Sequence, residues 1–165
     1  MRFASAILPF TLLATSVVGQ LTVLRGVLTD IQADVEVYGD AFTAGSGPDI
    51  TASGNELLAT AQAGIPIVQG ATAIGLIEAI QLRTTIESLQ VSVEDTYGTA
   101  VSQVAVVDAL GLKAATQAAF IAQRATVATL GAALVSKVPA LVRATAQGFV
   151  DEIDATIAAA IAAYA

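Results

Sequence analysis

Residues 21–42, LTVLRGVLTDIQADVEVYGDAF, decide the fold class of this chain. Their large apolar side chains recur at alternating intervals of three and four residues, which places them on one side of an α-helix. This stripe consists of Leu21, Leu24, Leu28, Ile31, Val35, Tyr38 and Phe42. Because Gly45-Ser46-Gly47-Pro48 follows with residues typical of turns, we predict a helix from about 21 to 43.

A second helix is predicted to begin at Ser53-Gly54-Asn55-Glu56, which has the pattern of a capping box. Gly64 and Pro66 should bend or loosen its middle, because proline has no amide hydrogen and crowds the preceding turn. The segment from Gly70 to Gly75 is the expected break before the next helix.

The remaining chain keeps the same helical spacing. It predicts a third helix of about 35 residues from 76 onward, which Gly98 could kink, and a turn at Leu110-Gly111-Leu112. A fourth, alanine-rich helix ends near Lys137, and Pro139 should lie in the first turn of a fifth. No segment alternates like a strand, so the expected fold is an all-α bundle of about five amphipathic helices.

The first 19 residues are predicted to be an export signal. Met1 and Arg2 give a positive start, and Phe3 to Val18 is apolar but shorter than the roughly 20 residues of a membrane-spanning helix. Cleavage after Gly19 would make Gln20 the first residue of the mature protein, and a cut after Ser16 is the alternative. We therefore expect a secreted protein with one domain over residues 20–165 and no transmembrane segment.

The composition argues against an enzyme. The chain has no histidine and no cysteine, which removes the usual base near neutral pH, the usual metal ligand and the most reactive nucleophile. Its 7 basic and 14 acidic residues give a net charge of −7, which disfavours a nucleic-acid partner. We expect no catalytic residue, no metal and no cofactor.

Several carboxylates could in principle perform acid–base chemistry or hold a cation. Asp30 and Asp34 are one helical turn apart, and Glu94-Asp95 and Asp151-Glu152-Ile153-Asp154 are the other acidic groups. They are spread around helices rather than gathered in a loop, and no imidazole assists them. The prediction is that they are solvated surface charges.

Five stretches carry a resemblance to a known family: Val27–Val35, Leu57–Gly64 before Pro66, Leu82–Tyr97, Leu134–Leu141 and the alanine-rich Asp151–Tyr164. Their order resembles a fungal family, the hydrophobic surface-binding protein A type domain that is shared with the antigenic cell-wall galactomannoproteins. The resemblance covers nearly all of residues 20–165. It implies a secreted or wall-associated helical domain that adsorbs to hydrophobic surfaces and in some members encloses a fatty acid. The chain lacks the long Ser/Thr-rich tail of the wall mannoproteins.

Two interpretations of the apolar stripes remain open at this point: they pack into a solid core, or they line a cavity. With the resemblance, the hypothesis is a non-enzymatic protein that binds hydrophobic surfaces and holds a long-chain fatty acid or similar lipid between helices one, three and five. The alternative is a structural or antigenic cell-wall protein with a solid core. Cell-wall polysaccharide is a further partner that the resemblance implies. The carboxyl group of the fatty acid should stay near solvent or form a hydrogen bond with the hydroxyl of Tyr38 or Tyr97. The predicted lining residues are Leu28, Ile31, Val35, Tyr38, Leu82, Ile86, Leu89, Val93, Tyr97, Phe149, Ile153 and Ile157.

Overall fold

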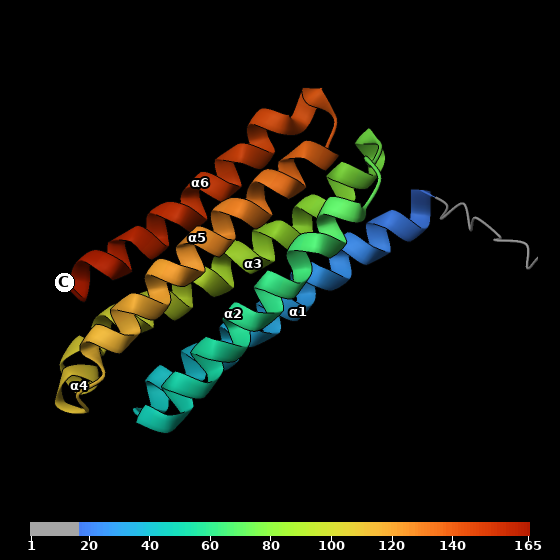
Figure 1. The fold of residues 1–165 in the computed structure, drawn as a ribbon. Coiled ribbons are helices and arrows are strands. Elements are labelled where there is room, and N and C mark those ends of the chain that lie inside the picture. Colours follow the sequence, from blue (N-terminus) through green and yellow to red (C-terminus); the bar gives the residue numbers. More distant parts are fainter. Residues whose placement is uncertain (1–16) are drawn as a thin grey trace, which may run out of the picture.

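The computed structural model describes residues 17–165, and these form six α-helices with short connections and no strand (Figure 1). The all-α prediction is confirmed, with one short helix beyond the five expected. Of the predicted export signal, residues 1–16 lie outside the described residues. The helices are α1 (Val17–Ala44), α2 (Gly47–Gly70), α3 (Leu76–Ser102), α4 (Val104–Ala109), α5 (Lys113–Lys137) and α6 (Ala140–Ala163).

The five long helices form a closed ring in which each one has two main neighbours. α1 packs against α2 and α3, α2 packs against α5, α5 against α6, and α6 against α3 (Figure 1). At the usual interaxial distance of about 8–10 Å, the axes of five helices in a ring lie roughly 7–8.5 Å from its centre. The side chains therefore have to fill a wider central space than in a four-helix bundle.

The apolar stripe of α1 faces this central space along the whole length of the helix. Every residue of the predicted stripe from Leu21 to Phe42 is buried, with at most 7% of its surface exposed. The acidic residues of α1 lie between them in sequence, and Asp30 is fully on the exposed side. The spacing of three and four residues thus identified the inward side of α1 correctly.

The start of α2 differs from the sequence prediction. Gly45 has a φ of +64°, which glycine adopts without strain, and Pro48 lies in the first turn, so the helix begins at Gly47 rather than at Ser53. Ser53 is buried within α2, and its hydroxyl donates to the carbonyl of Asp49 at 2.6 Å. The predicted capping box is therefore wrong, because this serine forms its hydrogen bond to the preceding turn of the helix.

The remaining helix boundaries differ from the sequence prediction in small ways. α2 continues as a single helix through Pro66 to Gly70, so this proline does not end it. The long third helix is divided at Gln103 instead of kinking at Gly98, and α4 follows directly. Pro139 immediately precedes α6 with a φ of −57°, within one residue of its predicted place in the first turn.

The interior of the ring has two different halves. At the end where α4 lies, five aromatic rings pack together, with centroid separations from 4.8 to 6.2 Å. We call this group the aromatic plug. The other half, toward the α2–α3 and α5–α6 connections, is lined by aliphatic side chains and Phe149. The members of the aromatic plug are Tyr38, Phe42, Tyr97, Phe120 and Tyr164.

Candidate binding cavity

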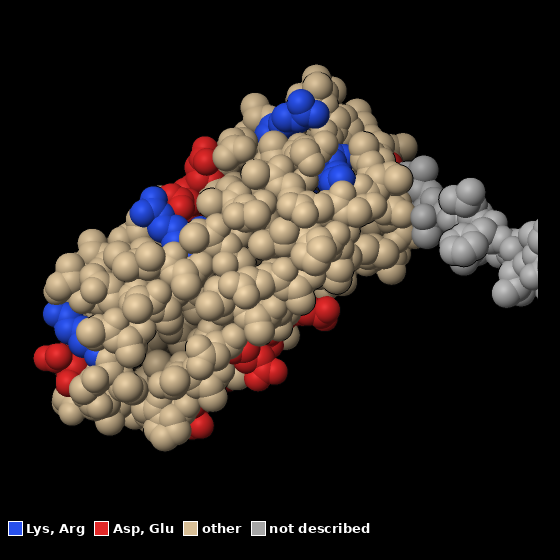
Figure 2. Space-filling view, viewed as in Figure 1, with Lys and Arg blue, Asp and Glu red and all other residues tan. Residues whose placement is uncertain are grey.

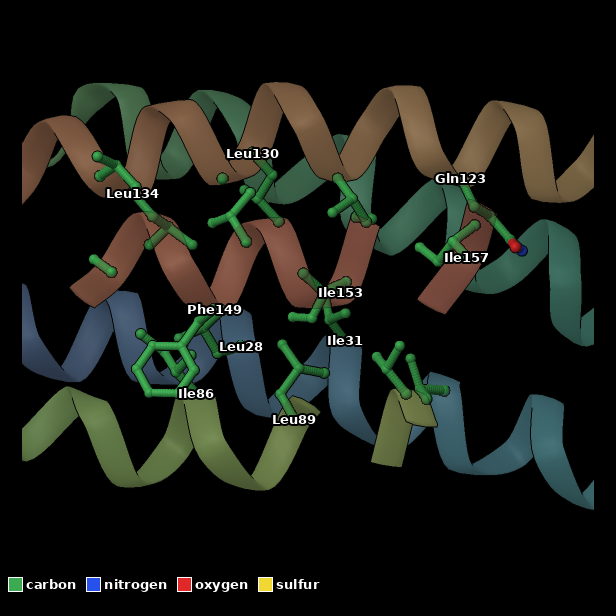
Figure 3. A pocket seen from close by; sticks show the side chains of 18 of the residues that line it. Leu28, Ile31, Ile86, Leu89, Gln123, Leu130, Leu134, Phe149, Ile153 and Ile157 are labelled. Carbon is green, nitrogen blue, oxygen red and sulfur yellow. The ribbon is translucent and has the colours of Figure 1, made fainter. Parts of the chain in front are cut away.

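The aliphatic half of the ring encloses a cavity of about 90 Å³, which we call the inner chamber (Figure 3). All five long helices contribute to its wall. Gln123 and Ile157 lie at one end of the view in Figure 3, and Ile86, Phe149 and Leu134 lie toward the other. The lining residues are Leu28, Ile31 and Val35 of α1; Leu57, Leu58 and Ala61 of α2; Leu82, Ile86, Leu89, Val93 and Tyr97 of α3; Gln123, Val127, Leu130, Gly131, Leu134 and Val135 of α5; Val138; and Ala146, Phe149, Val150, Ile153 and Ile157 of α6.

The polar side chains of the inner chamber, Tyr97 and Gln123, are already paired. The Tyr97 hydroxyl donates to Gln123 Oε1 at 2.7 Å, and Gln123 Nε2 donates to the carbonyl of Gly54 at 3.3 Å. Both side chains are buried. Their hydrogen bonds close the inner chamber against the aromatic plug, so we call the Tyr97–Gln123 pair its floor.

Tyr97 in the floor and Tyr164 in the aromatic plug are held in their neutral form. Burial raises the pKa of Tyr97 well above its usual range and raises the pKa of Tyr164 to about 12. Tyr164 donates its hydroxyl hydrogen to the carbonyl of Ala100 at 2.8 Å. Near neutral pH these phenols are therefore hydrogen-bond donors within the core, and they do not act as acids or bases.

Eleven of the twelve residues predicted to line a tunnel lie in the wall of the inner chamber, on α1, α3 and α6. Tyr38 is the exception. Its ring lies in the aromatic plug, 4.8 Å from the ring of Phe42, and faces Gly54 rather than the inner chamber. The hydroxyl of Tyr97 is engaged with Gln123, which leaves neither tyrosine as a ready partner for an acid group.

The contribution of α2 and α5 to the wall is not among the sequence predictions. Leu57 and Ala61 from α2, and Leu130 and Leu134 from α5, face the same space as the predicted residues. Their helical spacing is visible in the sequence, but the prediction rests on the helices with the longest stripes. Because the ring is closed, a helix with a shorter stripe forms as much of the wall as its neighbours.

A second cavity of about 140 Å³, which we call the outer chamber, lies between α3 and α6. It shares five wall residues with the inner chamber, so the two are separated only by side chains. Arg83 is the sole charged residue in the lining of either chamber. The shared residues are Leu82, Ile86, Val138, Ala146 and Phe149, and the outer chamber adds Ala79, Ile80, Arg83, Val142 and Thr145.

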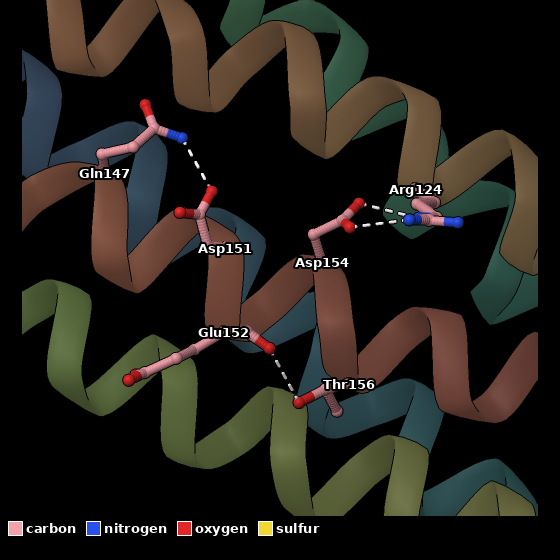
Figure 4. Close-up of polar contacts among 6 residues, drawn as sticks. All are labelled: Arg124, Gln147, Asp151, Glu152, Asp154 and Thr156. Atoms are coloured by element: carbon pink, nitrogen blue, oxygen red, sulfur yellow. Dashed lines mark hydrogen bonds and ion pairs between the residues drawn. The ribbon is translucent and has the colours of Figure 1, made fainter.

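The acidic residues of α6 lie on the outside of the ring (Figure 4). Arg124 of α5 donates two hydrogen bonds of 2.7 Å to the carboxylate of Asp154, and these bonds lower the pKa of Asp154. Gln147 donates to Asp151 at 2.8 Å. No group of three or more acidic side chains that could hold a metal ion occurs among residues 17–165. The Arg124–Asp154 pair links α5 to α6 at the surface, whereas the Gln147–Asp151 bond lies within α6.

Residues 14–136 match the sequence profile of hydrophobic surface binding protein A. The chain belongs to this family. The matched range covers α1 to α5, and α6 lies beyond it. A comparison with curated proteins gives no significant match.

Solved structures share the fold at low sequence identity. Ligand binding domain 1 of the Penicillium marneffei MP1 protein, complexed with arachidonic acids, is 17% identical with a TM-score of 0.86, covering 88% of this chain and 99% of that one. Ligand binding domain 2 of the same protein, complexed with multiple arachidonic acids, is 19% identical with a TM-score of 0.84, covering 87% and 95%. Afmp4p in complex with palmitic acid is 17% identical with a TM-score of 0.75, covering 90% and 99%.

Among residues 17–165, α5 has the length and apolar composition of a membrane-spanning helix, with a mean hydropathy of 1.5 over its most apolar stretch. Length and composition do not separate such a helix from a core helix of a helical bundle. Here α5 packs between α2 and α6 and buries Phe120, Gln123 and Leu130, which is the arrangement of a bundle helix.

Proposed function

We propose that this member of the hydrophobic surface binding protein A family is an extracellular, non-catalytic protein that binds a long-chain fatty acid inside the ring of helices. The observation that carries the proposal is the inner chamber, whose wall is aliphatic and without charge, and whose polar pair is satisfied internally. Such a wall recognises a hydrocarbon chain and offers no group for chemistry. A structural wall protein would need no such chamber.

The related structures support this assignment. Three of them share the fold over most of their length, and their ligands are arachidonic or palmitic acid. In this chain the inner chamber lies in the middle of the same fold. Cell-wall polysaccharide stays a prediction that only the family resemblance supports.

Binding requires the ring to widen. The inner chamber of about 90 Å³ and the outer chamber of about 140 Å³ are both small beside ligand sites of roughly 300–1,000 Å³. The side chains between the two chambers are the ones most easily displaced, because Ile86 and Phe149 are only partly buried. Rotation of these two side chains would join both chambers into one elongated space.

The hydrophobic effect is large enough to drive this change. Burying a methylene group contributes about 0.8 kcal/mol, so ten of them contribute roughly 8 kcal/mol before the costs of association and helix movement are subtracted. Micromolar affinity for a long acyl chain is the expected result.

Titration of the delipidated protein with palmitate tests the proposal. The parent should bind palmitate saturably, and Ile153→Trp should reduce the affinity at least tenfold, because the indole fills the inner chamber. Ile121→Trp is the matched control, since Ile121 is 53% exposed on α5 and lines neither chamber. Circular dichroism should show equal helix content in all three proteins. No saturable binding by the parent, or equal binding by Ile153→Trp, would mean that the stripes form an ordinary core.

We further propose that hydrophobic surfaces are bound at the end of the ring where α3 and α6 begin. Four large apolar side chains are exposed there, and we call this group the apolar tip. The connection α2–α3 is tied to this end, because the amide of Ile74 donates to the carbonyl of Lys137 at 2.9 Å. Exposed apolar groups that lie together are the usual mark of an interaction surface. The apolar tip consists of Leu76, Ile77, Ile80 and Leu141, with 40%, 70%, 58% and 81% of their surfaces exposed.

A further inference from the structure

We propose that Arg83 binds the carboxylate of the fatty acid in the outer chamber, so that the ligand passes between α3 and α6 with its acid group toward solvent. This inference rests on the proposed fatty-acid binding and adds the site of the headgroup. It starts from the single charged residue that lines either chamber, on a wall that is otherwise apolar apart from Thr145 and the floor.

Only side chains interrupt the path from the floor to Arg83. Ile86 and Phe149 belong to both chambers, and Figure 3 shows them close together at the end of the inner chamber that is remote from Gln123. Both are partly buried, so they form a movable partition rather than a fixed wall. A chain that displaces them enters the outer chamber, where Arg83 and the hydroxyl of Thr145 are the available donors.

The length of this path suits a long-chain acid. Arg83 and Tyr97 are both on α3 and are fourteen residues apart, which corresponds to about 21 Å along the helix at 1.5 Å per residue. An extended palmitate chain is of similar length. With its methyl end at the floor, the carboxylate would therefore lie close to the guanidinium of Arg83.

The distribution of charge also favours this end of the ring. The chain as a whole carries a net charge of −7, which repels a carboxylate. Arg25, Arg83, Lys137 and Arg143 nevertheless all lie toward the end where α3 and α6 begin, and Figure 2 shows basic side chains at that end of the molecule. Glu78 and Glu87 of α3 lie at the same end, so the excess of positive charge is smaller than the four basic residues suggest, but it would still offset the acidic balance of the rest of the surface.

Arg83 is available for a new partner. Its Nε lies 2.7 Å from Glu87 Oε1, one helical turn away, and the side chain of Arg83 is 60% exposed. An exposed pair of this kind contributes little to stability, because both groups remain in contact with water. A ligand carboxylate can therefore replace or share the contact with Glu87, and a guanidinium can bind it through two parallel hydrogen bonds.

Arg83→Gln separates recognition of the headgroup from burial of the chain. Calorimetric titration of the delipidated protein with palmitate should show roughly three- to tenfold weaker binding for Arg83→Gln than for the parent. Titration with 1-hexadecanol, which has the same chain and an uncharged head, should give equal affinity for both proteins. Glu87→Gln should strengthen palmitate binding by about twofold, because it removes the competing carboxylate.

Arg143→Gln is the matched control. It removes one positive charge near the same end, but Arg143 lines neither chamber, so palmitate affinity should change by less than about twofold. Equal losses for palmitate and hexadecanol, or no loss for either, would overturn the assignment of Arg83 while leaving the fatty-acid function intact. If the parent binds neither ligand, the proposed function itself fails, and the headgroup site fails with it.

Discussion

Gly131 on α5 lies where this helix packs closely against α6. A methyl group at this position would lie 2.5 Å from Val150 Cγ1 of α6, well inside contact distance. We expect Gly131→Ala to destabilise the protein by about 1–3 kcal/mol, because the helices must move apart or Val150 must leave its rotamer. Urea unfolding followed by circular dichroism measures this difference.

The double variant Gly131→Ala, Val150→Ala provides the control for the contact. Removing the isopropyl group of Val150 should recover part of the stability, so the two substitutions should be clearly non-additive. If their effects simply add, the contact between Gly131 and Val150 is not the cause of the loss.

At the scale of single residues, the sequence predicted which side of a helix faces inward, but not which half of the interior each inward residue occupies. Leu28 and Tyr38 belong to one stripe of α1, yet Leu28 lines the inner chamber and Tyr38 lies in the aromatic plug. Periodicity contains no information on where rings from other helices gather. Nothing in the sequence marks Arg83 as a binding residue either, because its proposed role depends on Phe149 and Thr145 of α6, which line the outer chamber with it.

Pro66 is the residue of α2 that fits a helix least. It lacks an amide hydrogen and lies inside a helix that continues to Gly70, with its side chain exposed. Pro66→Ala should raise the free energy of unfolding by about 1–2 kcal/mol, since the gained hydrogen bond outweighs the greater freedom of the unfolded chain. Thermal unfolding measures the change. A lower midpoint than the parent would show that the proline supports a local bend which α2 needs.

At the scale of elements, five of the six helices could be predicted from spacing, and the errors have local causes. Ser53 resembled a helix cap because serine bonds equally well to the turn before it, as its contact with Asp49 shows. No glycine or proline lies at Gln103, so the sequence gives no sign that the third helix divides there. The order of helices around the ring could not be predicted, because an apolar stripe shows which face of a helix is buried but not which helix packs against it.

For the molecule as a whole, adsorption to hydrophobic surfaces should depend on the apolar tip. Ile77→Ser combined with Leu141→Ser should reduce adsorption to polystyrene by more than half, because these are the most exposed large apolar side chains of the tip. The effect should persist in high salt, since it does not depend on charge.

Val37→Ser combined with Val91→Ser is the matched control for adsorption. These valines are 56% and 57% exposed, but each lies one helical turn from two acidic residues, Val37 from Asp34 and Asp40 and Val91 from Glu87 and Glu94. This control should adsorb like the parent. Equal losses for both double variants would assign adsorption to the general apolar character of the surface instead of the apolar tip.

The aromatic plug should limit the length of acyl chain that the proposed binding site can bury. Because the floor closes one end of the path, each added methylene of a saturated acid can be buried only until the methyl group reaches Tyr97 and Gln123. Up to that length, each methylene should strengthen binding by roughly fourfold, the factor that corresponds to about 0.8 kcal/mol. Beyond it, extra carbons remain in water outside the ring and add nothing. Affinity plotted against carbon number should therefore rise steeply and then level off. The aromatic plug would set the carbon number at which it levels off, because it fixes how deep the methyl end can reach.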